Sequence, residues 1–182
     1  MDRRQKKTRR SIYEAFESLM QENHYSQITV AQIIDRADIG RSTFYAHFET
    51  KDDLLDQMCN EMFEHVFEGV NEECITHANL QASDLKGVIA HLLYHLRDTH
   101  RGICGKLLCE NEPHFTAYFD AELRELFQRK IDFTRNGVPM DLRLTFLSTS
   151  LREAIGWWFR NDAKNTPEEI AAWYLRVWGI KE

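Results

Sequence analysis

The sequence predicts an all-α protein, and three observations lead to this prediction. Only three prolines and eight glycines interrupt the 182 residues, of which 43% are apolar, enough for one sizeable core or two small ones. Apolar residues recur at three- and four-residue intervals over long stretches, the spacing of helices with one buried face. Threonines that favour helix N-termini precede several of these stretches.

The first helix is predicted from about Lys6 to Glu22. Its apolar residues recur at i, i+3, i+4, i+7 and i+8, which is typical of a helix with one buried face. The polar run from Asn23 to Ser26 then ends the pattern. The predicted buried stripe consists of Ile12, Ala15, Phe16, Leu19 and Met20.

Two short helices are predicted next. Thr29 and Gln32 have the spacing of a capping box, which predicts a helix beginning at Val30. Asp38-Ile39-Gly40 is a tight connection, because Asp tolerates left-handed backbone and Gly is an acceptable N-cap. A third helix is expected over about Arg41 to Phe48.

This third helix combines one apolar face with many hydrogen-bonding groups. Phe44 and Phe48 lie four residues apart and can be buried together. Two short helices joined by such a turn, with a longer helix in front, form a helix-turn-helix, whose second helix enters the major groove of DNA. Tyr45 could instead be a half-buried packing residue, and His47 a local cap. The polar positions around the helix are Arg41, Ser42, Thr43, Tyr45 and His47.

The charge distribution favours a polyanionic partner at the N-terminal end. The net charge is −6, yet the chain up to Lys51 holds nine basic and seven acidic residues, against fourteen and twenty-two after it. Six basic residues lie within the first ten positions. A basic leading end on an acidic body suits DNA binding, although a solvated terminus would have the same composition.

The same region resembles the DNA-binding domain of the TetR family of bacterial transcriptional regulators, over about residues 7–58. The motif that carries the resemblance is Thr29-x-x-x-Ile33-x-x-x-Ala37, then Ile39-Gly40-Arg41-Ser42-Thr43-Phe44-Tyr45-x-His47-Phe48 and Lys51-x-x-Leu54-Leu55.

The resemblance implies a role for seven residues. Thr29 would contact a phosphate, and Tyr45, His47 and Lys51 would bind phosphates. The residues facing bases or nearby backbone would be Arg41, Ser42 and Thr43. The sequence departs from the family at Asp38 and Ser42, where glycines are common, and at Gly40, where a hydroxyl is usual. Gly40 cannot make a side-chain phosphate contact.

The chain after the DNA-binding domain of residues 1–58 predicts a larger helical effector and dimerisation domain, residues 59–182. Thr50 caps a fourth helix that is expected to end before Asn79, and a fifth helix follows Ser83. A short helix or turn is expected over residues 101–110, and a further helix from Pro113 to about Phe133. Asn136-Gly137 is expected to end this part of the helical pattern, and Pro139 is expected to begin the next helix.

The last two predicted helices contain all four tryptophans. The second begins at Thr166-Pro167-Glu168-Glu169, which supplies a cap, an N1 proline and a reaching glutamate. Aromatic residues are enriched in interfaces, so we expect a homodimer interface here, although these residues could simply close the core. Resemblance to one TetR subgroup implies the same pairing, with any effector pocket in this domain. The expected interface residues are Leu151, Ile155, Trp158, Phe159, Trp173, Tyr174, Val177 and Trp178.

The other groups of reactive side chains give little support to a metal site or an enzyme active site. His91 and His95 have a metal-binding spacing, but no acid completes a motif, so we expect no metal. The four cysteines lack CxxC spacing and are expected to be reduced thiols, with a redox switch as the alternative. No phosphate-binding loop or nucleophile motif is present, which predicts neither a cofactor nor an enzyme.

The predicted function is that of a DNA-binding transcriptional regulator in the cytoplasm. No apolar run approaches the ~20 residues that span a bilayer, and no secretory signal follows the basic N-terminus. As the TetR resemblance implies, we expect a homodimeric repressor that binds a pseudo-palindromic double-stranded operator, with a small-molecule effector as a further partner. The alternatives are a co-activator or adaptor acting through a protein partner, and a small helical enzyme or metal sensor.

Overall fold

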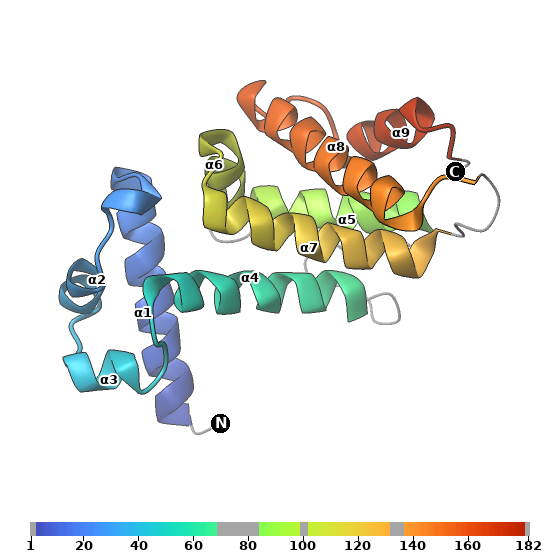
Figure 1. The fold of residues 1–182 in the computed structure, drawn as a ribbon. Coiled ribbons are helices and arrows are strands. Elements are labelled where there is room, and N and C mark those ends of the chain that lie inside the picture. The colour runs from blue at the N-terminus through green and yellow to red at the C-terminus, as the bar shows by residue number, and fades with distance from the viewer. Residues whose placement is uncertain (1–2, 69–83, 99–101, 132–136, 181–182) are drawn as a thin grey trace. The chain divides into compact units, whose positions relative to one another are not determined.

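The computed structural model describes residues 3–68, 84–98, 102–131 and 137–180, and the regular structure in these ranges is helical (Figure 1). The all-α prediction is therefore confirmed. The chain divides into two compact units, Met1–Asn60 and Glu61–Glu182, and one helix, α4 (Lys51–Glu68), passes from the first to the second.

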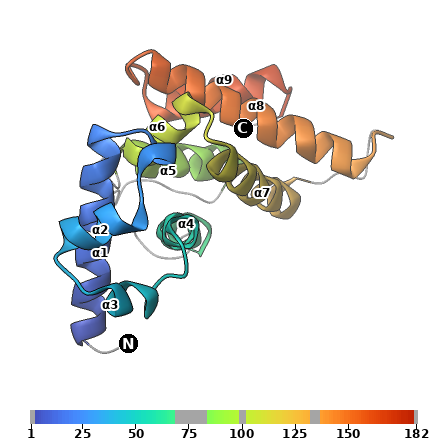
Figure 2. The same ribbon diagram turned by 60° about the vertical axis from the view of Figure 1, so that its left-hand side comes forward.

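The N-terminal unit places its short third helix beside the beginning of its first. In Figures 1 and 2, α3 lies at the end of this unit where α1 starts. The predicted stripe of α1 is buried, and the helix begins three residues earlier than expected. The elements before α4 are α1 (Arg3–Glu22), the 3-10 helix η1 (Tyr25–Gln27), α2 (Val30–Ala37) and α3 (Arg41–Tyr45).

The caps of α2 follow from local chemistry. The Thr29 hydroxyl accepts a hydrogen bond from the Gln32 N–H at 3.3 Å, and the Gln32 side chain accepts from the Thr29 N–H at 2.8 Å, which confirms the capping box. Asp38 ends the helix with φ 52° and ψ 51°, the left-handed conformation that Asp tolerates. The Ser11 hydroxyl donates to the Ala37 carbonyl at 3.2 Å and so ties α1 to this turn.

The third helix ends at Tyr45, three residues before the predicted end. The N–H groups of His47 and Phe48 both donate to the Phe44 carbonyl, each at 2.9 Å, so the chain tightens into a turn there. The shared face is nevertheless formed as predicted. Phe44 and Phe48 are buried, with ring centroids 5.8 Å apart.

The start of α4 is capped as expected. The Asp53 N–H donates to the Thr50 hydroxyl at 2.9 Å, and the Asp53 carboxylate accepts from the Glu49 N–H at 2.8 Å. Beyond Asn60, Phe63 of α4 packs on α7 (Pro113–Lys130), 5.4 Å from the Phe119 ring. The expected continuation of α4 towards Asn79 lies outside the described residues.

The C-terminal unit packs α8 (Met140–Arg160) against α7, α6 (Ile103–Glu110) and α9 (Pro167–Val177). The remaining helix, α5 (Leu85–Asp98), packs against α9 and α6. Thr166 and Glu169 form the capping box predicted for α9. The helix expected to reach Phe133 ends at Lys130, and both Phe133 and the predicted stop at Asn136 lie outside the described residues.

A glycine allows α6 and α8 to approach closely. A Cβ atom at Gly105 would lie 2.5 Å from Cε1 of Phe159, closer than real Cβ contacts. Because the Phe159 ring covers this position, a methyl group there requires the ring or one helix to move. Glycine is therefore needed at position 105 because a side chain does not fit beside the Phe159 ring, and not because of its backbone conformation.

We expect Gly105→Ala to lower the free energy of unfolding by about 1–3 kcal/mol, the usual cost of overpacking. Urea unfolding followed by circular dichroism would measure this change. Gly156→Ala in α8 is the matched control, since a Cβ there meets only the end of the flexible Arg160 side chain, at 3.1 Å. Equal stability of the Gly105→Ala and wild-type proteins would contradict the packing argument.

Candidate nucleic-acid interface

The short helix α3 presents polar side chains around a buried anchor. Phe44 has no exposed surface, whereas the neighbouring Tyr45 side chain is 51% exposed. Arg41 and Ser42 are also exposed, and Thr43 and His47 are half-buried. The structure thus brings the five predicted polar positions together on one short segment, which the buried rings of Phe44 and Phe48 fix to the core.

Basic residues of α1 lie near this segment. The Arg9 guanidinium lies over the rings of Tyr13 and Phe48, 5.3 and 5.4 Å from their centroids. Its Nε also donates to the Tyr13 hydroxyl at 2.9 Å. α1 starts at the end of the unit that carries α3 (Figures 1 and 2). Its first described turns contain four further basic residues, all exposed. These are Arg3, Arg4, Lys6 and Lys7.

Two of the predicted phosphate ligands already make intramolecular bonds. The Thr29 hydroxyl donates to Oε1 of Gln32 at 2.9 Å within the capping box. The Lys51 ammonium donates to the carbonyl oxygens of Tyr25, at 2.7 Å, and of Ile28, at 3.0 Å. The Thr29–Gln32 pairing was expected from the capping box. Sequence reasoning missed the bonds of Lys51, whose partners lie 26 and 23 residues away.

The expected interface residues of α8 and α9 fall into two groups. Leu151, Ile155 and Trp158 have no exposed surface, so they form the core of their own protomer and cannot meet a partner. Tyr174 is 5% exposed and Phe159 is half-buried. Trp173, Val177 and Trp178 are exposed, and Val177 most of all, at 83%.

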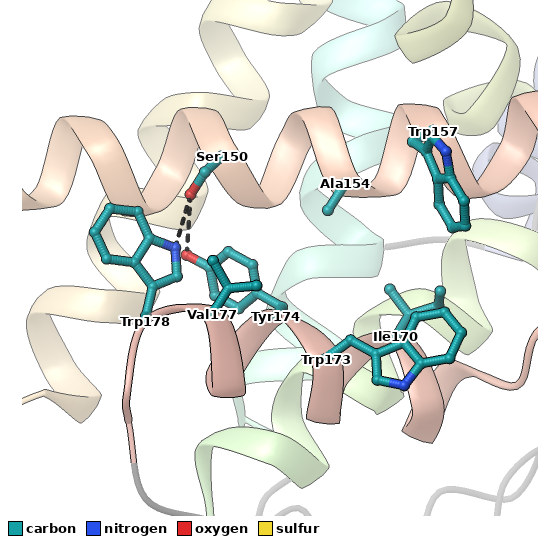
Figure 3. Close-up of a pocket in the computed structure, with 8 residues that line it drawn as sticks. All are labelled: Ser150, Ala154, Trp157, Ile170, Trp173, Tyr174, Val177 and Trp178. Atoms are coloured by element: carbon teal, nitrogen blue, oxygen red, sulfur yellow. Dashed lines mark hydrogen bonds between the residues drawn. The ribbon is translucent and has the colours of Figure 1, made fainter.

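The exposed members line an apolar groove between α8 and α9 with a volume of about 200 Å³ (Figure 3). Trp157, which is 47% exposed, also lines it, although we did not include this residue in the predicted interface. The spacing of Leu142, Phe146 and Trp157 places them on one exposed stripe of α8, a pattern that the sequence already contained. The groove is lined by Ser150, Ala154, Trp157, Ile170, Trp173, Tyr174, Val177 and Trp178.

Hydrogen bonds hold one end of this groove. Trp178 Nε1 donates to the Ser150 hydroxyl at 3.1 Å (Figure 3). The Tyr174 hydroxyl donates to the Leu147 carbonyl at 2.7 Å. Burial raises the pKa of Tyr174, so its hydroxyl stays a donor. The rings of Trp178 and Tyr174 are therefore fixed in place before any partner arrives.

The histidine pair lies in the interior of the C-terminal unit. His91 and His95 are buried in α5, with their Nε2 atoms 3.0 Å apart. Among the residues that the structure describes, no group of three or more metal-ligating side chains is present.

Within the same residues, no helix is long and apolar enough to cross a membrane. Cys104 and Cys109 are free thiols, Cys59 is buried, and Cys74 lies outside the described ranges.

The capped α2, the tight turn and the anchored α3 define a helix-turn-helix DNA-binding protein. Comparisons with known proteins agree with this class. Residues 12–58 match the family described as bacterial regulatory proteins, tetR family, and residues 83–176 match a transcriptional regulator C-terminal region.

The chain is similar to a TetR transcriptional regulator from Streptococcus agalactiae, with 33% identity, coverage of 97% of this chain and 96% of that one, and a TM-score of 0.73. It is also 46% identical over 48 residues to DhaS of Lactococcus lactis, an activator of the dhaKLM operon, over 26% of each protein. The structure of Bacillus subtilis FadR in complex with stearoyl-CoA shares the fold, with 19% identity, coverage of 92% and 95%, and a TM-score of 0.55.

The chain therefore belongs to the TetR family of bacterial transcriptional regulators, whose members are regulators rather than enzymes. This confirms the resemblance seen in the sequence and the expectation that the protein is not an enzyme. It also makes the protein a helix-turn-helix DNA-binding regulator.

Proposed function

We propose that the protein is a homodimeric repressor that binds a pseudo-palindromic operator through α3. Residues 1–58 bind DNA, and residues 59–182 dimerise and hold any effector. The observation that carries the proposal is the exposed polar face of α3 above the buried Phe44 ring. Because the protein acts on the chromosome, its place of action is the bacterial cytoplasm.

The contacts follow from the exposure of each side chain. Arg41, Ser42 and Thr43 lie at the N-terminal end of α3, the part of a recognition helix that contacts base edges. Tyr45 and His47 can donate hydrogen bonds to phosphates on either side of the groove. Thr29 joins them if its hydroxyl hydrogen turns from Gln32 to a phosphate oxygen. The basic start of α1 adds positive charge at the same end.

Two copies of the protein are needed for an operator with two-fold symmetry. The exposed apolar face of α8 and α9 supports pairing with a second copy, because isologous contacts bury the same patch on both partners. Trp157, Trp173, Val177 and Trp178 supply the aromatic and aliphatic area that such interfaces favour. The dimer then presents two α3 helices to half-sites about one helical turn apart, or somewhat more.

We expect Tyr45→Ala to weaken binding to all DNA sequences about equally, since it removes a phosphate contact. Thr43→Ala should instead change which base is preferred at one position of each half-site. Fluorescence anisotropy with the selected operator and single-base variants of it would separate the two effects. A Tyr45→Ala protein with a new base preference and unchanged affinity would contradict the assignment.

The second candidate is an activator or adaptor. DhaS, which is similar to this chain over its helix-turn-helix region, is an activator. A reporter gene placed behind the bound promoter distinguishes the two directions. Repression predicts higher expression when the regulator gene is deleted, and activation predicts lower expression. An adaptor that works through a protein partner would give no DNA complex even at low salt.

A small-molecule effector is proposed to release the protein from its operator. FadR, which shares the fold, was solved with stearoyl-CoA, and this supports a small-molecule effector for the present protein. A ligand can lower DNA affinity only by binding better to a form whose half-site spacing does not fit the operator. The melting temperature of the protein with candidate ligands, followed by anisotropy on the operator, tests this part.

A further inference from the structure

Lys51 occupies an unusual position for a cation. It is the first residue of α4, where the N-terminal end of the helix carries partial positive charge and favours acids, such as the Asp52 and Asp53 that follow. A lysine there is unfavourable unless its ammonium finds compensation elsewhere. The side chain folds back to do so, and it is half-buried.

Backbone carbonyl oxygens in and directly after η1 compensate for the unfavourable position of the Lys51 ammonium group. Nζ donates to the carbonyl oxygens of Tyr25, at 2.7 Å, and Ile28, at 3.0 Å, and lies 4.2 Å from the centroid of the Tyr25 ring. Two of the three ammonium hydrogens are thus directed to backbone oxygens, and the charge lies on an aromatic ring. Bonds from a charged donor are stronger than those between neutral groups.

The next residue of α4 completes the arrangement. The hydroxyl of Tyr25 donates to the Asp52 carboxylate, so consecutive residues of α4 hold both ends of one tyrosine. The Tyr25 side chain is 3% exposed and packs edge-on against Phe16 of α1, 6.2 Å between ring centroids. Thr29, the N-cap of α2, directly follows Ile28. The start of α2 is therefore bound to the start of α4.

We propose that Lys51 is a positioning residue for DNA binding, which acts by clamping η1 and the N-terminus of α2 to the first turn of α4. This inference rests on the proposed function and differs from the phosphate contact that the family resemblance implied. The clamp keeps the helix-turn-helix in its binding-competent arrangement. Without it, the competent arrangement is populated for only part of the time, and affinity falls by that fraction.

Salt dependence separates a positioning residue from a phosphate ligand. Loss of one phosphate contact reduces the slope of log K against log salt by about 0.9, whereas loss of positioning lowers affinity at all salt concentrations with the slope unchanged. The test uses the full-length protein and the duplex that it enriches from a random-sequence pool. Lys51→Met keeps the apolar stem and removes the ammonium.

We expect Lys51→Met to weaken DNA binding by about tenfold, the effect of leaving a tenth of the molecules in the binding-competent arrangement. The slope of log K against log salt should stay that of the wild-type protein. Hydrogen exchange should accelerate at residues 25–33 in the absence of DNA, more than in the rest of the unit. Lys6→Met is the charge-matched control, because it removes one exposed cation from the basic start of α1 and should reduce the slope by about 0.9. Ile12→Val, a fully buried change in α1, controls for lower stability alone and should keep DNA affinity below its melting temperature.

A reduced slope for Lys51→Met with unchanged exchange at residues 25–33 would overturn the inference and establish a phosphate contact. If Lys51→Met does not fold, the DNA affinity of Lys51→Arg distinguishes a phosphate ligand from the clamp. A phosphate ligand predicts wild-type affinity for this variant, and the clamp predicts weaker binding, since a planar guanidinium does not replace the compact ammonium. Failure of the wild-type protein to bind any duplex would refute the proposed function itself, a result distinct from either outcome at Lys51.

Discussion

Replacing Val177 by glutamate should convert the proposed dimer into a monomer. Val177 lies in α9 with 83% of its surface exposed, so the change leaves the protomer fold intact. In the proposed dimer the side chain is covered, and an uncompensated buried charge costs about 3–5 kcal/mol. This weakens association by a factor on the order of a hundred or more. Sedimentation velocity over a range of concentrations measures the effect.

The matched control is Gln128→Glu, which adds the same charge on the exposed face of α7. This protein should remain a dimer. The Val177→Glu monomer should also lose operator binding, because each half-site is then bound without its partner. An intact Val177→Glu dimer with wild-type DNA affinity would show that α9 does not form the interface.

Replacing Phe44 by alanine should have the largest effect on the N-terminal unit. The ring has no exposed surface and packs against Phe48, 5.8 Å between ring centroids. Truncating a buried phenylalanine costs about 3–5 kcal/mol, which is a large part of the stability of a unit this small. DNA binding should disappear together with the α3 structure.

Tyr45→Ala, at the adjacent position, is the control for Phe44→Ala. Its side chain is half exposed, so the unfolding temperature should stay close to that of the wild-type protein while DNA affinity falls. Thermal unfolding followed by circular dichroism, with anisotropy on the same samples, compares the two variants. If Phe44→Ala unfolded at the wild-type temperature, the ring would not be the anchor of α3.

Local chemistry made much of the fold predictable. The pairs Thr29–Gln32 and Thr166–Glu169 each lie three residues apart, and both form the capping boxes expected from their sequence. Asp38 takes the left-handed conformation that its side chain tolerates. These features depend on neighbours within one turn, so a single sequence contains all the information they need.

Tertiary contacts decided what the sequence left open. Trp157 and Trp158 are adjacent and chemically identical, yet they are 47% and 0% exposed. α8 carries an exposed apolar stripe as well as a buried one, and only packing against other helices decides which tryptophan is buried. The Trp158 N–H finds its partner in the Asn165 carbonyl, at 2.9 Å. The predicted interface residues therefore included core residues, and the exposed Trp157 was not among them.

The same limit applies to the candidate DNA-binding site. The polar positions of α3 were recognisable from spacing, since Phe44 and Phe48 define the opposite face. The bonds of Lys51 were not, because they join backbone oxygens more than twenty residues away. A motif indicates which residues lie near DNA, and only the fold shows which of them are already engaged.

Selection of DNA from a random-sequence duplex pool tests whether the protein recognises a specific operator through α3. Wild-type protein and the Arg41→Ala variant would be compared at low salt, and the retained fragments sequenced. We expect the wild-type protein to enrich a pseudo-palindromic sequence and the variant, although a dimer of wild-type stability, to lose this enrichment. A folded wild-type dimer that retains no sequence above background, or an Arg41→Ala protein that selects the same sequence with the same affinity, would contradict it.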